Sequence, residues 1–251
     1  MDFGIAGTVA LVTGATKGIG LGIAHALARE GARVSVVART EEDVRRVAKE
    51  IKGFGVTGDV TTEEGCRRSV EQTEQNLGKI DILVNNFGAR AGSTWSDTGP
   101  KEFEAAFQGN VIVSARMSQL VLQGMVERGW GRIVVIASVW GREAGGAPAY
   151  NAAKAAEISM VKSLAREVAA KGVTVNAVAP GSILWEGGGW HRRRQADPEG
   201  IAEFVRREMP IGRFGTVDEV ASVVAFVCSR QASLLTGACI NVDGGHSRSN
   251  I

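Results

Sequence analysis

The sequence predicts an α/β fold in which a doubly wound, parallel sheet carries helices on both faces. Short apolar runs rich in Val and Ile alternate along the chain with longer amphipathic stretches, and many of the 33 glycines fall between them. Such strand–helix alternation requires right-handed crossovers, which place the strands side by side in parallel. We expect roughly seven strands in a single domain, residues 1–251, because no linker or break in composition divides the chain.

The predicted strands are apolar runs too short for a typical helix and rich in β-branched residues, as strands buried on both faces should be. The clear ones cover residues 9–13, 34–38, 80–85, 132–138, 173–179 and 238–242. A weaker run ends at Gly58-Asp59-Val60. In doubly wound sheets ligands bind at the carboxyl ends of the strands, so functional residues are expected there.

Helices are predicted in the amphipathic stretches between these strands. In the first stretch Ile19, Ile23, Ala26 and Leu27 recur at nearly helical spacing, and Gly31 follows as a stop signal. The predicted helices cover residues 19–30, 41–51, 63–77, 101–127, 149–171 and 217–229.

Residues 182–209 interrupt the alternation, and we expect them to form an insertion above the sheet that acts as a mobile substrate lid. The insertion contains a triple glycine flanked by Trp185 and Trp190, which are expected to form an apolar wall around the reacting atoms. A basic run at residues 191–194 follows. It is either a solvated helix face or a site for an anionic group, and the sequence leaves both interpretations open.

Composition argues against several classes of protein. The net charge of +2 is too small to indicate a nucleic-acid or membrane surface, and no apolar run approaches the ~20 residues that cross a bilayer. The three cysteines lack CxxC spacing, and His25, His191 and His246 are scattered, so no metal site is predicted. The chain start has no signal-peptide pattern, and we expect a cytoplasmic protein without membrane or nucleic-acid partners.

A glycine-rich turn directly follows the first predicted strand and opens the first predicted helix. Gly14 permits the sharp turn, Gly18 lets the backbone approach a pyrophosphate, and Gly20 allows close packing of helix on sheet. The helix N-terminus adds N–H donors and a favourable dipole for a phosphate. A tight turn without a ligand is the alternative, but the strand–turn–helix context favours a nucleotide site made by Gly14, Thr16, Lys17, Gly18, Ile19 and Gly20.

This TGxxxGxG pattern resembles the short-chain dehydrogenase/reductase family, and further segments resemble the family in the same order. Asn85-Asn86-Phe87-Gly88 is similar to its NNAG motif, although Phe87 replaces the usual Ala. Other similar segments are Pro180-Gly181, residues 210–215 and residues 236–245. The resemblance covers nearly the whole chain and implies a Rossmann-type domain that transfers a hydride between a nicotinamide and a substrate.

The end of the second strand indicates which nicotinamide cofactor is used. Relatives that prefer NAD usually carry an acidic residue at the position of Ala38, and Arg39 follows here. Without a carboxylate a 2′-phosphate is not repelled, and a guanidinium can bind it, aided by Lys17. The sequence therefore predicts NADP(H). By resemblance, the remaining cofactor contacts are Asp59, Val60, Asn86, Gly88, Tyr150, Lys154, Pro180, Gly181 and Ile183, whereas Trp185 replaces a Thr that usually contacts the carboxamide.

Tyr150 is the only tyrosine, and Lys154 follows four residues later, so the two side chains share one face of the predicted helix. A free phenol is a poor base at neutral pH, and a nearby ammonium lowers the pKa of a phenol towards the range useful in acid–base catalysis. The pair therefore suits proton transfer coupled to hydride transfer. The resemblance further implies that Ser138 hydrogen-bonds the substrate oxygen and that Asn110 holds a water in a proton relay.

The function predicted is NADP(H)-dependent interconversion of a carbonyl and a secondary alcohol. The chain is similar to 3-oxoacyl-[acyl-carrier-protein] reductases, so the substrate is expected to be a small carbonyl or alcohol, anionic or acyl-carrier-linked. An NAD-preferring sugar or cyclic-alcohol dehydrogenase is the alternative, and a catalytically silent nucleotide-binding regulator is a further one. Relatives are commonly homotetramers, and the resemblance implies the same assembly here.

Overall fold

The computed structural model, which describes residues 2–250, contains a seven-stranded sheet with the order β3-β2-β1-β4-β5-β6-β7. All neighbouring strands pair in parallel. The predicted fold class is therefore confirmed. The strands are β1 (Val9–Thr13), β2 (Arg33–Ala38), β3 (Phe54–Thr57), β4 (Ile82–Asn85), β5 (Gly131–Ile136), β6 (Val173–Pro180) and β7 (Cys239–Val242).

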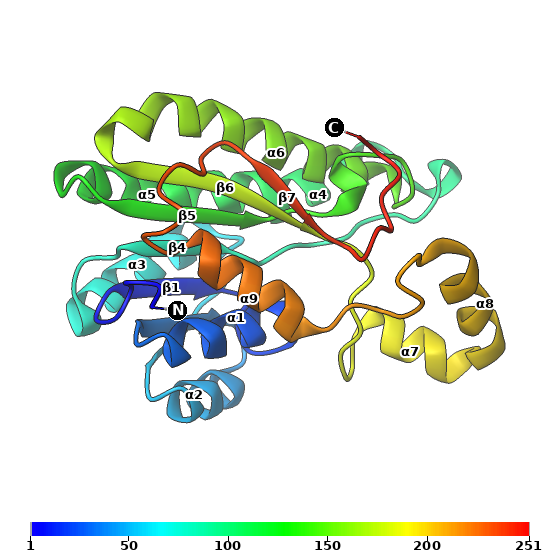
Figure 1. Cartoon of the computed structure of the whole chain (residues 1–251), viewed down its shortest axis with the longest axis horizontal. Coiled ribbons are helices and arrows are strands. Elements are labelled where there is room, and N and C mark those ends of the chain that lie inside the picture. The colour runs from blue at the N-terminus through cyan, green and yellow to red at the C-terminus, as the bar shows by residue number, and fades with distance from the viewer. Residues whose placement is uncertain (1, 251) are drawn as a thin grey trace.

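Helices cover both faces of this sheet (Figure 1). One face packs against α1 (Gly18–Arg29), α2 (Glu41–Glu50) and α9 (Val217–Val227). The other packs against α3 (Glu63–Leu77), α5 (Val113–Glu127) and α6 (Pro148–Val168), with α4 (Pro100–Phe107) beside α6. Successive side chains of a strand point to opposite faces, so Ala10 and Val12 enter one apolar core while Val9 and Leu11 enter the other.

The chain order reverses around β1, which pairs with β2 on one side and β4 on the other. At such a switch point the connections leave the sheet in opposite directions and open a crevice at the carboxyl ends of the strands. The loops that follow β1, β4, β5 and β6 carry most of the residues predicted from the sequence. The topology thus brings separate segments of the chain to one edge of the sheet.

Two predicted elements differ from the structure. The weak strand expected to end at residues 58–60 ends earlier, at Thr57, so Asp59 and Val60 lie in the following loop. The single helix expected at residues 101–127 is divided by a π turn, Gln108–Ile112, which contains Asn110. The buried amide of Asn110 donates to the carbonyl oxygen of Ala106 at 2.6 Å. It thereby competes with the regular helical hydrogen bonds at this point.

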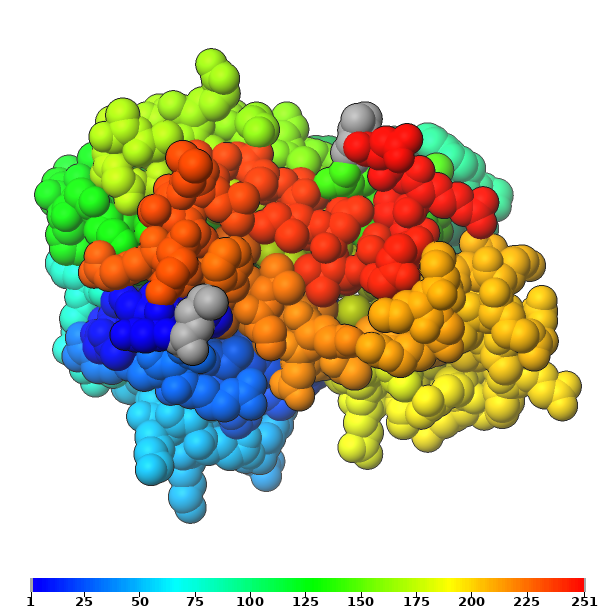
Figure 2. Space-filling model, in the orientation of Figure 1, coloured from blue at the N-terminus to red at the C-terminus, as the bar shows by residue number. Residues whose placement is uncertain are grey.

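The insertion predicted at residues 182–209 forms two helices, α7 (Gly189–Ala196) and α8 (Pro198–Glu208). Figure 2 shows them as a lobe at one end of the molecule. The start of the insertion is tied to the segment that follows it, because Ile183 forms an isolated bridge with Gly215. Trp190 stacks on Phe204 with ring centroids 4.6 Å apart and lies 5.1 Å from the ring of Phe214, which holds the lobe to the segment that returns to the sheet. Whether the lobe acts as a lid stays a prediction.

Candidate active site

The glycine-rich turn joins β1 to α1 at the carboxyl end of the strand. Gly14 and Gly18 have φ angles of +62° and +54°, a backbone conformation that favours glycine. A Cβ at Gly20 would overlap the side chain of Asn86 and the carbonyl of Gly14, so this glycine is needed for close packing. Thr16 is buried within the turn, and Ile19 packs against the core below it.

Asn86, which follows β4, is hydrogen-bonded to this turn. Its Nδ2 donates to the carbonyl oxygens of Thr13 and Gly14, at 2.9 and 3.0 Å. The Thr13 hydroxyl accepts in turn from the backbone N–H groups of Asn86 and Phe87, at 3.1 and 3.0 Å. The Asn86 side chain thus supports the turn, and its contact with a cofactor stays a prediction.

Cationic side chains lie near the ends of β1 and β2. Ala38 ends β2 and is followed by Arg39, which is exposed, as is Lys17 at the start of α1. Neither cation makes a hydrogen bond or ion pair within residues 2–250. In the loop after β3, hydrogen bonds from the backbone and hydroxyl of Thr61 lower the pKa of Asp59, and the charge of Arg39 lowers it further. Val60 is buried in the same loop.

These residues fit a dinucleotide that carries a 2′-phosphate. The glycine turn presents its backbone at the N-terminus of α1, a position that suits a pyrophosphate, and the exposed guanidinium of Arg39 matches the geometry of a phosphate. The position next to it, Ala38, carries no carboxylate that would repel a phosphate. The site therefore has the features expected for NADP(H) rather than NAD(H).

Tyr150 and Lys154 lie in the first turns of α6, one helical turn apart. Nζ of Lys154 is 5.6 Å from the centre of the Tyr150 ring and donates to the carbonyl oxygen of Ile136, the last residue of β5, at 2.9 Å. The pair therefore lies at the carboxyl end of the sheet. The Tyr150 side chain is half-buried, and its hydroxyl makes no hydrogen bond within the described residues, so it is available to a substrate.

Two charged residues beside this pair were missed by the sequence analysis. The carboxylate of Glu157 is fully buried and accepts from Lys154 Nζ at 2.8 Å. The guanidinium of Arg90 lies over the Tyr150 ring, 4.9 Å from its centre. Burial alone lowers the pKa of Lys154, but the negative charges of Glu157 and Tyr150 outweigh burial and raise it above its ordinary value. The i,i+3 spacing of Lys154 and Glu157 is the sequence signal that could have revealed the ion pair.

Asn110 lies against the same group of residues. Its side chain is fully buried, its Nδ2 donates to Ala89 O at 2.8 Å, and its Oδ1 has no hydrogen-bond partner within residues 2–250. A Cβ at Gly88 would lie 2.9 Å from this Oδ1 and 3.4 Å from Lys154 Nζ. The fold thus brings Gly88, Asn110 and Lys154 together, while the water-holding role of Asn110 stays a prediction.

Ser138 lies two residues beyond the end of β5, where a short 3₁₀ turn, Val139–Gly141, begins. The residue is buried, and its Oγ accepts from the N–H of Trp140 at 3.2 Å. Because Oγ is the acceptor in this bond, its hydroxyl proton remains free for donation to another oxygen. Ser138 is therefore suited to donate a hydrogen bond to a substrate carbonyl.

The segment after β6 holds the last group of predicted contacts. Pro180 ends β6, and the N–H of Gly181 donates to Val242 O at 3.0 Å, which places both residues beside the end of β7. Ile183 is buried where the insertion begins. Trp185 packs on the glycine turn and Trp190 on the aromatic rings of the lobe. Trp185 and Trp190 therefore pack against different partners and do not form the single apolar wall that was expected.

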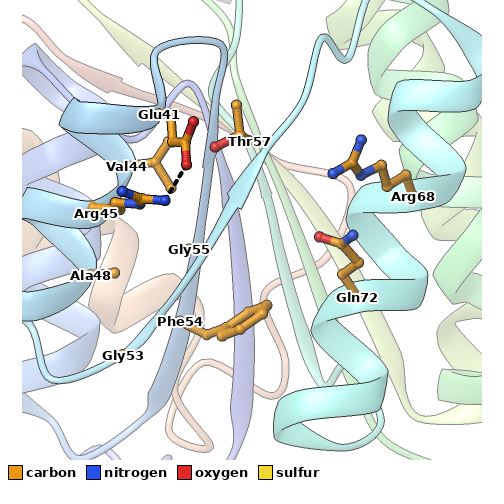
Figure 3. Close-up of a pocket in the computed structure, with 10 residues that line it drawn as sticks. All are labelled: Glu41, Val44, Arg45, Ala48, Gly53, Phe54, Gly55, Thr57, Arg68 and Gln72. Atoms are coloured by element: carbon orange, nitrogen blue, oxygen red, sulfur yellow. Dashed lines mark ion pairs between the residues drawn. The ribbon is translucent and has the colours of Figure 1, made fainter.

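A hollow of about 570 Å³ lies elsewhere, between α2 and α3 beside the edge strand β3 (Figure 3). An ion pair between Arg45 and Glu41 lies along one wall, and Arg68 and Gln72 project from the other. None of the predicted site residues lines this hollow. It is a concavity beside the edge strand of the sheet.

Residues 2–250 contain neither a candidate metal cluster nor a helix that could span a membrane. Within that range no three His, Cys, Asp or Glu side chains are placed to hold a metal ion together. Over the same residues, no helix combines the length and hydropathy that a bilayer crossing requires.

Comparison with known proteins gives consistent matches over nearly the whole chain. The family described as enoyl-(acyl carrier protein) reductase matches residues 14–247. The chain is 36% identical to an acetoacetyl-CoA reductase of Shinella zoogloeoides, covering 94% of this chain and 97% of that protein. It is 37% identical to a 3-oxoacyl-[acyl-carrier-protein] reductase of Aquifex aeolicus, covering 98% and 99%.

The fold is also similar to that of a solved structure. The L-sorbose reductase of Gluconobacter frateurii, in complex with NADPH and L-sorbose, superimposes with a TM-score of 0.93 and 32% sequence identity. The match covers 99% of this chain and 100% of that one. At this identity the shared fold reflects common descent.

Proposed function

The chain belongs to the short-chain dehydrogenase/reductase family, and we propose that it reduces a 3-oxoacyl thioester at the expense of NADPH. It is an NADP(H)-dependent oxidoreductase that acts on C=O and CH–OH groups. One observation carries the assignment of the site. Tyr150, whose hydroxyl has no hydrogen-bond partner within residues 2–250, lies beside the buried ammonium of Lys154 at the carboxyl end of β5.

The proposed roles of the side chains follow from their positions. Bound NADPH supplies the hydride. Ser138 donates a hydrogen bond to the carbonyl oxygen and polarises it, and the Tyr150 hydroxyl gives its proton to the same oxygen, so that C=O becomes CH–OH. Lys154 stabilises the phenolate that remains on Tyr150 and offers its free N–H to the ribose hydroxyls. The glycine turn, Arg39 and Lys17 hold the phosphates.

The type of double bond that is reduced follows from the same site. The matching family is described by its enoyl reductases, which act on C=C bonds, whereas the relatives of Shinella and Aquifex are named for reduction of an oxo group. Ser138 begins the 3₁₀ turn that packs on α6, the helix of Tyr150, and a hydroxyl donor there suits an oxygen that becomes an alkoxide. We therefore assign carbonyl reduction.

The function is tested by following NADPH oxidation with a panel of substrates. Acetoacetyl-CoA and longer 3-oxoacyl thioesters should be reduced with kcat/KM of about 10⁴ M⁻¹s⁻¹ or more, within the range usual for enzymes. An enoyl thioester should not react. Turnover of the enoyl compound but not the oxo compound would refute the assignment.

A ketose is the second candidate substrate. The similarity to L-sorbose reductase over the full chain favours it, because that protein was solved with NADPH and a sugar. L-Sorbose and other ketoses therefore belong in the same panel. If kcat/KM for a ketose exceeds the value for every thioester, the protein is a sugar reductase and the thioester proposal is wrong.

The remaining proposals concern assembly and location. We propose a cytoplasmic homotetramer built through α5 and α6, and exposure of Leu120 on α5, at 42%, supports an apolar contact there. An acyl carrier protein is the proposed partner, since its acidic surface would complement the exposed arginines of α7 and α8. Light scattering after gel filtration tests the tetramer, and a titration with acyl carrier protein tests the partner.

A further inference from the structure

Glu157 is buried in the wall of the proposed active site and has no part in the roles assigned above. Tyr150, Lys154 and Glu157 occupy positions i, i+4 and i+7 of α6, so their side chains lie along one face of the helix. The side chains of Lys154 and Glu157 are 3% and 0% exposed. A buried carboxylate is unfavourable unless charges and hydrogen bonds compensate it, so its partners indicate what it does.

Both oxygens of Glu157 have a partner. Oε2 accepts from Lys154 Nζ at 2.8 Å, and Oε1 accepts from the Ser114 hydroxyl at 2.9 Å. Lys154 Nζ also donates to Ile136 O at 2.9 Å. Two of the three N–H groups of the ammonium are thus engaged within the protein, which leaves one for a ligand.

These contacts join three elements behind the site. Ser114 lies on α5, Ile136 ends β5, and Glu157 lies on α6. The network continues from Ser114 to Ser118, whose hydroxyl donates to Ser114 O at 2.7 Å, and the Asn85 amide at the end of β4 donates to Ser118 at 3.2 Å. A lysine has a long, flexible stem, and this network restricts it to one position.

We propose, on the basis of the function proposed above, that Glu157 is a positioning residue: its carboxylate holds the Lys154 ammonium in place beside Tyr150 before any cofactor binds. The single N–H that remains then points to the ligand without a rearrangement of the side chain. Preorganisation of this kind lowers the entropy lost on binding and fixes the charge next to the proton donor.

The charges around Lys154 provide a direct readout. Glu157 and Tyr150 favour the ammonium, whereas burial and Arg90 disfavour it. Removal of the Glu157 charge leaves burial as the dominant effect, so the pKa of Lys154 should fall. If the Glu157 side chain served only for packing, its replacement by Gln would leave the pKa of Lys154 unchanged.

The test compares two substitutions of the same residue. Glu157→Gln keeps the size and shape of the side chain but removes its negative charge. Glu157→Asp keeps the charge but shortens the side chain by one methylene. Ionisation of Lys154 is followed by NMR of protein labelled with ¹³C at the ε-carbon of lysine, the signal being assigned by its loss in Lys154→Arg. Affinity for NADPH is measured separately, by calorimetry. Ser114→Ala removes a neighbouring hydrogen bond, and Glu167→Gln, on the exposed face of α6, is the control for a lost surface charge.

In Glu157→Gln the titration midpoint of Lys154 should fall by about one pH unit or more, and NADPH should bind about 10-fold more weakly, equivalent to about 1.4 kcal/mol. In Glu157→Asp the midpoint should stay high while NADPH affinity falls. Ser114→Ala and Glu167→Gln should leave the midpoint unchanged. An unchanged midpoint and affinity in Glu157→Gln would overturn the proposal. If that variant does not fold, undiminished NADPH affinity in Glu157→Asp overturns it. Neither readout requires turnover, so the result is independent of the substrate assignment.

Discussion

The indole of Trp185 lies directly against Gly18 of the glycine-rich turn. A Cβ at Gly18 would lie 2.8 Å from Cε2 and 3.0 Å from Cδ2 of Trp185. Gly188 packs on the same indole, with a Cβ there 2.7 Å from Cε2. Gly18 is the position at which a pyrophosphate is expected to approach the backbone. The first segment of the insertion therefore lies against the proposed phosphate site.

Binding of NADP⁺ should displace Trp185 from this position. The intrinsic fluorescence spectrum should shift when NADP⁺ is added, and the shift should be lost in Trp185→Phe. Trp190→Phe is the matched control, because Trp190 packs within the lobe against Phe204 and should not report the event. If Trp185→Phe and the unaltered protein give the same shift, the indole does not move with the cofactor.

Arg39 should determine the choice of cofactor. We expect kcat/KM for NADPH to exceed that for NADH by at least ~10-fold, about 1.4 kcal/mol of discrimination. Ala38→Asp combined with Arg39→Leu should reverse much of this preference, because it replaces a phosphate-binding cation with a carboxylate. Arg45→Leu is the control, since Arg45 is paired with Glu41 on α2. Equal efficiency with both cofactors in the unaltered protein would contradict this role of Arg39.

Most of the fold could be predicted from the sequence because strong patterns lie in the buried strands. The runs around Val9 and Val173 are mostly apolar and rich in Val, and the structure buries every residue of both strands. The strand near Gly58 was misplaced because β3 is a short edge strand, Phe54–Thr57, whose side chains are mostly half-buried, so its apolar pattern is weak. The π turn at Asn110 depends on hydrogen bonds to Ala89 and Ala106, which spacing alone does not reveal.

The parts of the candidate site that could be predicted are those formed by residues close together in the sequence. The separation of Tyr150 and Lys154 fixes their relation on one helix, and the glycine turn is local to residues 13–20. Long-range neighbours could not be foreseen in the same way. Arg90 reaches Tyr150, and Trp185 reaches Gly18, only because the sheet brings distant loops together.

The basic run of α7 should respond to the charge of the substrate. Arg192 donates to Gly187 O at 2.6 Å and Arg193 lies over the Trp190 ring, whereas Arg194 has no partner within residues 2–250. Replacement of Arg192, Arg193 and Arg194 by Ala should raise KM for a CoA thioester by about 3- to 10-fold and change KM for a neutral ketone by less than about 2-fold. Equal changes in both values would show that the run is a solvated helix face.

Glu219 should stabilise the start of α9 in a pH-dependent manner. Hydrogen bonds from Arg213 and Thr216 lower the pKa of Glu219 to about 2. A lowered pKa means that the stabilisation is complete above the pKa of the unfolded chain, near 4.3, and disappears as the pH falls through about 2. Glu219→Gln should therefore reduce Tm at pH 7, and the difference should vanish as the pH falls towards 2. A difference in Tm that is constant over this range, measured by circular dichroism, would contradict the assignment.

Tyr150 is proposed to give its proton to the substrate oxygen, and Tyr150→Phe removes the group that would do so. The substitution removes one hydroxyl from the only tyrosine of the chain and keeps the aromatic ring over which Arg90 lies. With the preferred substrate, kcat should fall by about 10²- to 10⁴-fold, whereas the Kd for NADPH should change by less than about 3-fold, because the phosphate contacts are untouched. Turnover within about 2-fold of the unaltered protein, in a variant that binds NADPH normally, would show that another group supplies the proton.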